Sequence, residues 1–210
     1  MLTNVAAVGA TALMMLGGSA VDGQVAHAAP LLPGPVSVSV VSTAGSGCPA
    51  AQASVTSVGQ DGFTLRLPSF TARTGNSAKI TERRRNCQVG VTVTGPVGWT
   101  YTLSKADYRG RAQLAKGAVG TMHAAYYFAG LSDTTRYTRT LTGPRTTAWQ
   151  ASDSTEIRKL GWAPCGTPRS LNINTEVRVK PGPVRNSTSL MTLGSGGNTS
   201  ASYRLSWKKC

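Results

Sequence analysis

The chain has 210 residues, only 14% of them charged, and it is rich in hydroxyl side chains, with 26 Thr and 20 Ser. This length favours one domain, or one domain with a tail, over a multidomain protein. Hydrophobic residues make up 40% of the chain and include four Trp, six Tyr and three Phe, which argues against intrinsic disorder. The net charge of +14 favours negatively charged partners such as anionic glycans, wall polymers, nucleic acid or membrane surfaces, without selecting among them.

The beginning of the chain has the features of a secretory signal. Residues 5–21 are apolar and small, and Ala26-His27-Ala28 supplies an A-x-A cleavage site. We predict that residues 1–28 are a signal peptide, that residues 29–45 are a leader, and that residues 46–210 form a single β-rich domain. The apolar stretch is short and interrupted by glycine, so we expect a secreted chain without a membrane span in its mature part.

Period-two alternation of apolar and polar residues begins at Val36, which is typical of half-buried strands. About ten such runs follow one another, separated by Gly and Pro. A helical turn is predicted around residues 154–160, with Ser154 as its cap. One long exposed loop is predicted over residues 181–197, where Gly, Ser, Asn and Pro dominate. The clearest alternating runs are residues 89–93, 99–103, 121–128, 171–180 and 203–207.

No long helical period occurs, so the pattern predicts an all-β protein. Short alternating strands in a cysteine-bearing exported chain favour an antiparallel β-sandwich, with a β-barrel as the alternative.

All four cysteines lie in the predicted mature part: Cys48, Cys87, Cys165 and Cys210. An even number in an exported chain predicts two disulfides, and four cysteines allow three pairings. We favour Cys48 with Cys87 and Cys165 with Cys210, because neighbours in sequence close shorter loops. The cysteine spacing contains no C-x-x-C or Cys/His cluster, so we predict no metal site and no cofactor.

Several short landmarks accompany these cysteines. They are Gly47-Cys48-Pro49, residues 84–88 (RRNCQ), 107–110 (DYRG), 126–128 (YYF), Pro164-Cys165-Gly166, 171–174 (LNIN) and 207–210 (WKKC). In this order, the landmarks resemble the exported four-cysteine family catalogued as domain of unknown function 4360, over about residues 46–210. The resemblance implies export, disulfides and a β-rich fold, and it implies no activity.

Catalytic signatures are weak throughout the sequence. A Ser-His-acid triad would depend on His123, the one histidine of the predicted mature chain, and we interpret it as an outward-facing strand residue. Glycoside hydrolysis needs two carboxylates facing one cleft. Convergence of Asp107 and Glu176, for example, would support a hydrolase. The other carboxylates of the mature chain are Asp61, Glu82, Asp133, Asp153 and Glu156.

Basic residues are the one feature with a functional leaning, because guanidinium groups suit phosphate and carboxylate oxygens. If the run Arg83-Arg84-Arg85 is extended, Arg83 and Arg85 project together and Arg84 lies opposite. The candidate ligand-binding residues are Arg83, Arg85, Arg109, Arg111, Arg178 and Lys180.

The sequence offers two other candidate sites. Trp149 and Trp162 fall outside the clean strands and, with Tyr127, form a candidate aromatic site for sugar or base faces. The alternating Asn172, Asn174 and Glu176 are a candidate polar ladder, although a solvated strand face is the default.

We therefore predict a secreted, monomeric, non-enzymatic binding or interaction module for anionic glycans or wall polymers, with a protein target as a further possibility. No specific recognition of nucleic acid is predicted. The alternatives are a secreted polysaccharide hydrolase, and an inhibitor or toxin acting through the exposed loop at residues 181–197.

Overall fold

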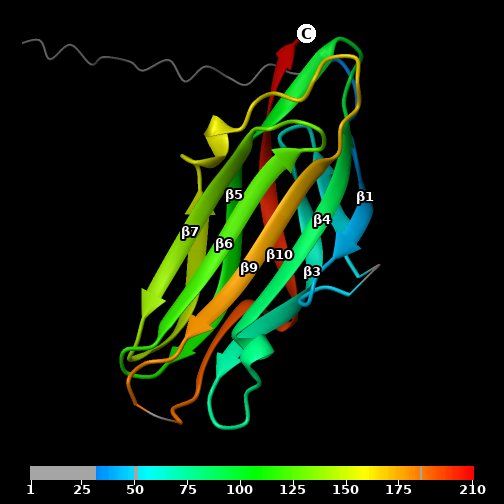
Figure 1. Ribbon diagram of the computed structural model, residues 1–210. Helices are drawn as coiled ribbons and strands as arrows, with labels where there is room; N and C mark the ends of the chain where they lie inside the picture. The colour runs from blue at the N-terminus through cyan, green and yellow to red at the C-terminus, as the bar shows by residue number, and fades with distance from the viewer. Residues whose placement is uncertain (1–31, 50–51, 185) are drawn as a thin grey trace, which may run out of the picture.

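The computed structural model describes residues 32–49, 52–184 and 186–210. For residues 195–200 it describes the backbone but not the side chains. These parts of the chain contain ten strands and two short 3-10 helices (Figure 1). The strands are β1 (Ser37–Ala44), β2 (Ser54–Gly59), β3 (Gly62–Thr74), β4 (Arg84–Thr94), β5 (Trp99–Leu114), β6 (Val119–Phe128), β7 (Thr134–Thr142), β8 (Arg145–Asp153), β9 (Leu171–Lys180) and β10 (Ser189–Lys209). The helices are η1 (Ile80–Arg83) and η2 (Ile157–Lys159).

The strands form two five-stranded sheets that pack face to face. Sheet A has the order β1-β4-β9-β6-β7, and sheet B has the order β2-β3-β10-β5-β8. All pairings are antiparallel. The fold is the predicted β-sandwich. The sheets do not close into a barrel, because β1 and β7 remain the edges of sheet A and β2 and β8 the edges of sheet B.

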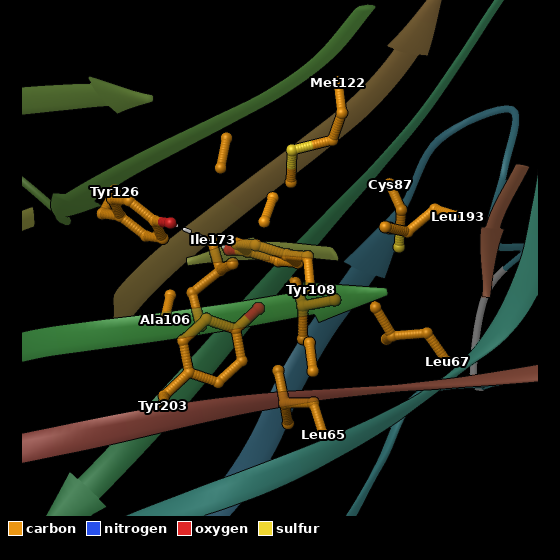
Figure 2. Close-up of a cluster of buried hydrophobic side chains, with 14 of the residues drawn as sticks. Leu65, Leu67, Cys87, Ala106, Tyr108, Met122, Tyr126, Ile173, Leu193 and Tyr203 are labelled. Carbon is orange, nitrogen blue, oxygen red and sulfur yellow. Dashed lines mark hydrogen bonds between the residues drawn. The ribbon is translucent and has the colours of Figure 1, made fainter. Parts of the chain in front are cut away.

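Alternation along each strand builds the core between the sheets. In β9, the buried residues alternate with half-buried or exposed ones over the whole strand, as the sequence predicts. Leu65, Met122 and Ile173 come from three strands and are fully buried together (Figure 2). The core also holds polar groups, since the hydroxyls of Tyr108 and Tyr126 hydrogen-bond across the two sheets at 3.0 Å.

Two disulfides join the predicted partners. Cys48 bonds Cys87 at the start of β4, and both residues are buried in the core. Cys165 bonds Cys210 near the end of β10, and both residues are exposed. The favoured pairing is confirmed.

The sequence predictions fail at two local points. The turn predicted around residues 154–160 is present as η2, but its N-cap residue is Glu156, not Ser154. The first backbone N–H of the helix, that of Ile157, is accepted by Oδ1 of Asp153 at 3.1 Å. The loop predicted over residues 181–197 is wrong from Ser189 onward, because β10 begins there and pairs with β3 and β5. Residues 189–193 (SLMTL) contain three apolar residues and suit a strand, although the Gly, Ser, Asn and Pro on either side of them are typical of a loop.

Part of the predicted leader belongs to the fold. The predicted signal peptide, residues 1–28, lies outside the described residues. Residues 37–44 of the predicted leader form β1 and pair with β4, so this part of the leader belongs to sheet A. In the part of the chain that the structure describes, no helix is long and apolar enough to cross a membrane.

Candidate functional site

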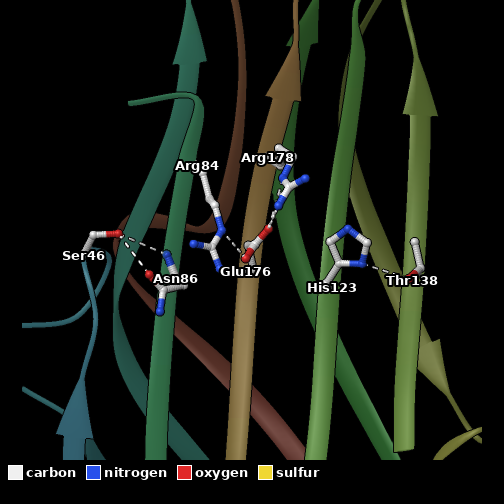
Figure 3. A network of polar contacts seen from close by, with 7 residues as sticks. All are labelled: Ser46, Arg84, Asn86, His123, Thr138, Glu176 and Arg178. Atoms are coloured by element: carbon white, nitrogen blue, oxygen red, sulfur yellow. Dashed lines mark hydrogen bonds and ion pairs between the residues drawn. The ribbon is translucent and has the colours of Figure 1, made fainter. Parts of the chain in front are cut away.

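Two arginines face each other on the outer surface of sheet A. Arg84 opens β4, and the strand register places it directly opposite Arg178 on β9. Glu176, two residues before Arg178, accepts both side chains: Oε2 binds Nε of Arg84 at 2.5 Å, and Oε1 binds Nη2 of Arg178 at 3.0 Å. Figure 3 shows the carboxylate between the two guanidinium groups. We call Arg84, Glu176 and Arg178 the arginine clamp.

The charge of the arginine clamp is only partly balanced. Like charges directly opposite one another on neighbouring strands repel, and the single carboxylate offsets one of the two positive charges. The side chain of Glu176 is 12% exposed, whereas those of Arg84 and Arg178 are 57% and 54% exposed. The clamp therefore presents two oriented guanidinium groups and one uncompensated positive charge to solvent.

Polar side chains continue this surface across sheet A. Asn86 accepts a hydrogen bond from the hydroxyl of Ser46 at 3.2 Å, and Nδ1 of His123 lies 2.9 Å from Oγ1 of Thr138 (Figure 3). His123 faces outward on β6, as predicted, and the register places it beside Glu176. Further along the same face, Nε2 of Gln88 donates to the hydroxyl of Tyr127 at 3.2 Å. The outer face of sheet A is thus basic at one end and amide-rich and aromatic toward the other.

The structure separates the six basic residues that the sequence selected. Arg178 and Lys180 lie on β9 in sheet A, two residues apart and both exposed. Arg109 and Arg111 are exposed on β5 in sheet B. They therefore lie on the opposite face of the sandwich from Arg178 and Lys180. Within the described residues, neither Arg109 nor Arg111 forms an ion pair.

Arg83 and Arg85 lie at the entry of β4. Arg83 ends η1, and its Nε is buried without a hydrogen-bond partner among the described residues. Nη2 of Arg85 lies 3.8 Å from Oε1 of Glu82. Hydrogen bonds from Arg73 and from the backbone of Lys79 lower the pKa of Glu82. The run of three arginines is therefore not uniformly extended, because the 3-10 helix occupies its first residue.

Sequence reasoning missed Arg84 as a site residue. Cys87, Val89 and Val91 of β4 point into the core, so the alternation places Arg84, with Asn86 and Gln88, on the outer face. That signal was present in the sequence. The pairing with Arg178 was not, because it depends on which strand lies beside β4.

The carboxylates proposed as a catalytic example do not converge. Asp107 lies on β5 in sheet B, and its Oδ2 forms an ion pair with Nζ of Lys105 at 3.0 Å. Burial acts to raise the pKa of Asp107, but hydrogen bonds from Ser152 and Lys105 outweigh it and lower the pKa. Glu176 belongs to the other sheet and is held by two arginines. In the described parts of the chain, no group of three or more His, Cys, Asp or Glu side chains is placed to hold a metal ion.

The three aromatic residues proposed as a second site are also apart. Trp149 of β8 is buried in the core, which corrects its placement in a loop. Trp162 is exposed, with Nζ of Lys208 4.5 Å from its ring centroid. Tyr127 lies on the outer face of sheet A. These residues do not form one binding surface.

Two solved structures show distant similarity to this chain. A structure of TmCBM61 in complex with beta-1,4-galactotriose aligns over 84% of this chain and 89% of that chain, with 10% identity and a TM-score of 0.25. The enzymatically active domain of tailspike protein 4 of bacteriophage CBA120 aligns over 83% of this chain and 19% of that chain, with 10% identity and a TM-score of 0.21. Scores this low support no conclusion about the present chain.

Comparisons of sequence give a clear relationship. The chain is 34% identical over 148 residues to an "Uncharacterized secreted protein" of Arthroderma benhamiae (strain ATCC MYA-4681 / CBS 112371). The alignment spans 70% of this chain and 60% of the length of that relative. The family model described as "Domain of unknown function (DUF4360)" matches residues 35–210, which include all four cysteines. This secreted chain therefore belongs to the DUF4360 family.

Proposed function

We propose that this chain is an extracellular, non-enzymatic binding module that holds anionic polymers at the arginine clamp. The observation that carries the proposal is the direct cross-strand pairing of Arg84 with Arg178, both ion-paired to Glu176 and both more than half exposed. A repelling pair at this position has no structural advantage over a neutral pair. An anionic group bound between the two guanidinium groups would relieve the repulsion.

The chemistry of the clamp suits carboxylate, sulfate or phosphate groups. Guanidinium groups offer several N–H donors in a plane and bind such oxygens with charge-assisted hydrogen bonds. Glu176 restricts both side chains before a ligand arrives, so less conformational entropy is lost on binding. Lys180 is exposed on the same face of β9, about 7 Å further along the strand, where it can meet the next charged group of a polymer.

The test compares two double variants of equal charge. Arg84→Ala/Arg178→Ala removes the clamp from sheet A, and Arg109→Ala/Arg111→Ala removes two exposed arginines from sheet B. Binding of the secreted, oxidised protein to polygalacturonate, heparin and DNA is measured across a salt series. We expect the clamp variant to lose about tenfold in affinity, equivalent to about 1.4 kcal/mol, for at least one polymer, and the matched variant to lose much less.

Salt dependence gives an independent readout. Charge-driven binding weakens as ionic strength rises, and each lost charged contact reduces the slope of log affinity against log salt by roughly one. Equal losses in the two double variants would mean that net charge alone attracts the polymers. Either that result or an absence of binding to all three polymers would refute the proposed site.

A further inference from the structure

A separate cleft of about 410 Å³ opens at the end of the sandwich where Figure 1 marks the C-terminus. It lies between the turn of residues 95–98, which joins β4 to β5, and the segment of residues 163–169, with Cys210 at its edge. Thr94 lines this cleft at one end of β4, and Arg84 lies at the other end of the same strand, about 34 Å away. The cleft and the arginine clamp are therefore distinct sites.

Three aromatic side chains line the cleft. They are Trp99, Tyr101 and Trp207. The rings of Tyr101 and Trp207 lie 5.5 Å apart between centroids, and the indole N–H of Trp207 donates to the carbonyl of Gln60 at 2.7 Å. Trp207 also occupies the space that a side chain at position 95 would need, so Gly95 permits its position. Packing and this hydrogen bond hold the indole ring in place before any ligand binds.

The polar side chains that the cleft exposes lie at its rim. Thr94 and Thr167 are exposed residues of the lining, and their hydroxyls can donate and accept hydrogen bonds. The hydroxyl of Tyr101, by contrast, is buried and has no hydrogen-bond partner among the described residues, and burial raises its pKa. Tyr101 therefore contributes its ring, and the two threonines contribute hydroxyls.

The rest of the lining limits the chemistry of an occupant. Arg169 is the one charged residue that lines the cleft within the described part of the chain, and it is exposed at the rim. The volume lies near the lower end of the range for small-molecule sites, so it suits a compact molecule of one or two rings. An extended peptide would need a longer groove. The exposed hydroxyls of Thr94 and Thr167 favour an occupant with polar groups over a purely apolar molecule.

We infer that this cleft binds an uncharged sugar of one or two rings, whose C–H faces pack against Trp99 and Trp207 and whose hydroxyls pair with the exposed Thr94 and Thr167. Aromatic rings bearing or neighbouring a hydroxyl combine a flat apolar surface with a polar handle, and a pyranose needs both. The inference does not depend on the anionic site, because the two sites share no residue.

Tryptophan fluorescence tests the inference directly, since two indoles line the cleft. The secreted protein is titrated with cellobiose, maltose, lactose and N,N′-diacetylchitobiose, and binding is checked by calorimetry. We expect a saturable signal with at least one of these sugars. The Trp99→Ala variant should bind it about five- to tenfold more weakly, the loss expected for one aromatic contact. The matched control is Trp162→Ala, because Trp162 is exposed near the C-terminus but does not line the cleft.

Two further variants make the test decisive. Thr167→Arg adds a large side chain to an exposed residue of the lining and should block binding without disturbing the core, even if Trp99→Ala folds poorly. Arg84→Ala/Arg178→Ala should bind the sugar normally, whatever it does to anionic polymers. Absence of a signal with all four sugars, or equal losses in Trp99→Ala and Trp162→Ala, would overturn the inference. Loss of sugar binding in the clamp variant would also overturn it.

Discussion

Removing one disulfide at a time tests how the two bridges stabilise the sandwich. Cys48 and Cys87 are separated by 39 residues, and Cys165 and Cys210 by 45 residues. In the loop-entropy model, a bridge that closes a loop of either length stabilises the folded chain by about 4 kcal/mol. If the constraint on the unfolded chain were the whole effect, the two bridges would contribute equally.

Burial makes the two bridges unequal. Cys48 and Cys87 lie in the core, whereas Cys165 and Cys210 are exposed. Cys48→Ala/Cys87→Ala removes two buried sulfur atoms in addition to the constraint. At about 1 kcal/mol for each buried group of this size, packing adds about 2 kcal/mol. We therefore expect losses of about 6 kcal/mol for Cys48→Ala/Cys87→Ala and about 4 kcal/mol for Cys165→Ala/Cys210→Ala.

Urea unfolding of the two variants and the parent protein measures these differences. The free energy of unfolding is compared at a common urea concentration within the transitions, and the slope m shows whether the unfolded state has changed. Equal losses, or a larger loss for the exposed bridge, would refute the assignment of extra stability to core packing. Partial reduction followed by alkylation and mass mapping gives a kinetic check, because a thiolate must reach the sulfur it attacks and should therefore open Cys165–Cys210 first.

Three further predictions concern the core and its edges. Burial raises the pKa of Asp153, so its ionisation in the folded state costs stability as the pH rises above the ordinary aspartate value of about 3.9. In pH-dependent urea unfolding, Asp153→Asn should therefore gain stability relative to the parent as the pH rises from 4 to 7, whereas Asp153→Ala should lose about 1 kcal/mol by removing the acceptor of the Ile157 N–H. Gly110→Ala should lower the free energy of unfolding by about 1–3 kcal/mol, because the added methyl group would overlap the backbone carbonyl of Thr192 and the ring of Trp149; unchanged thermal stability would contradict this packing. Tyr126→Phe should cost about 1–2 kcal/mol by leaving the Tyr108 hydroxyl unpaired, and a double-mutant cycle with Tyr108→Phe should give a total smaller than the sum of the single losses.

Patterns that act within one strand were readable from the sequence. The alternation of residues 171–180 matches β9 at both ends, and the alternation of residues 121–128 correctly places His123 on the outer face of β6. These predictions succeed because side chains alternate between the two faces of any strand, whatever its partners are. Arg84 could have been placed on the outer face by the same rule.

Properties that depend on neighbouring strands were not readable. Residues 189–193 (SLMTL) lie within a stretch rich in Gly, Ser, Asn and Pro, yet they pair with β3, and residues 190–193 pair with β5 as well. Arg109 and Arg178 both occupy outward strand positions, but they lie on opposite sides of the molecule because β5 and β9 belong to different sheets. Trp149 reads as a loop residue and is instead packed over Gly110.

The sequence by itself determined the all-β class and the alternating burial of the clearest strands, because these follow from the local period. It favoured one disulfide pairing among three, and the structure decided for that pairing. Only the tertiary structure decided the order of strands in the two sheets. That order sets Arg84 beside Arg178 and gathers Trp99, Tyr101 and Trp207 around one cleft. Both arrangements join residues far apart in the chain, and only the packing of one strand against another fixes such distances.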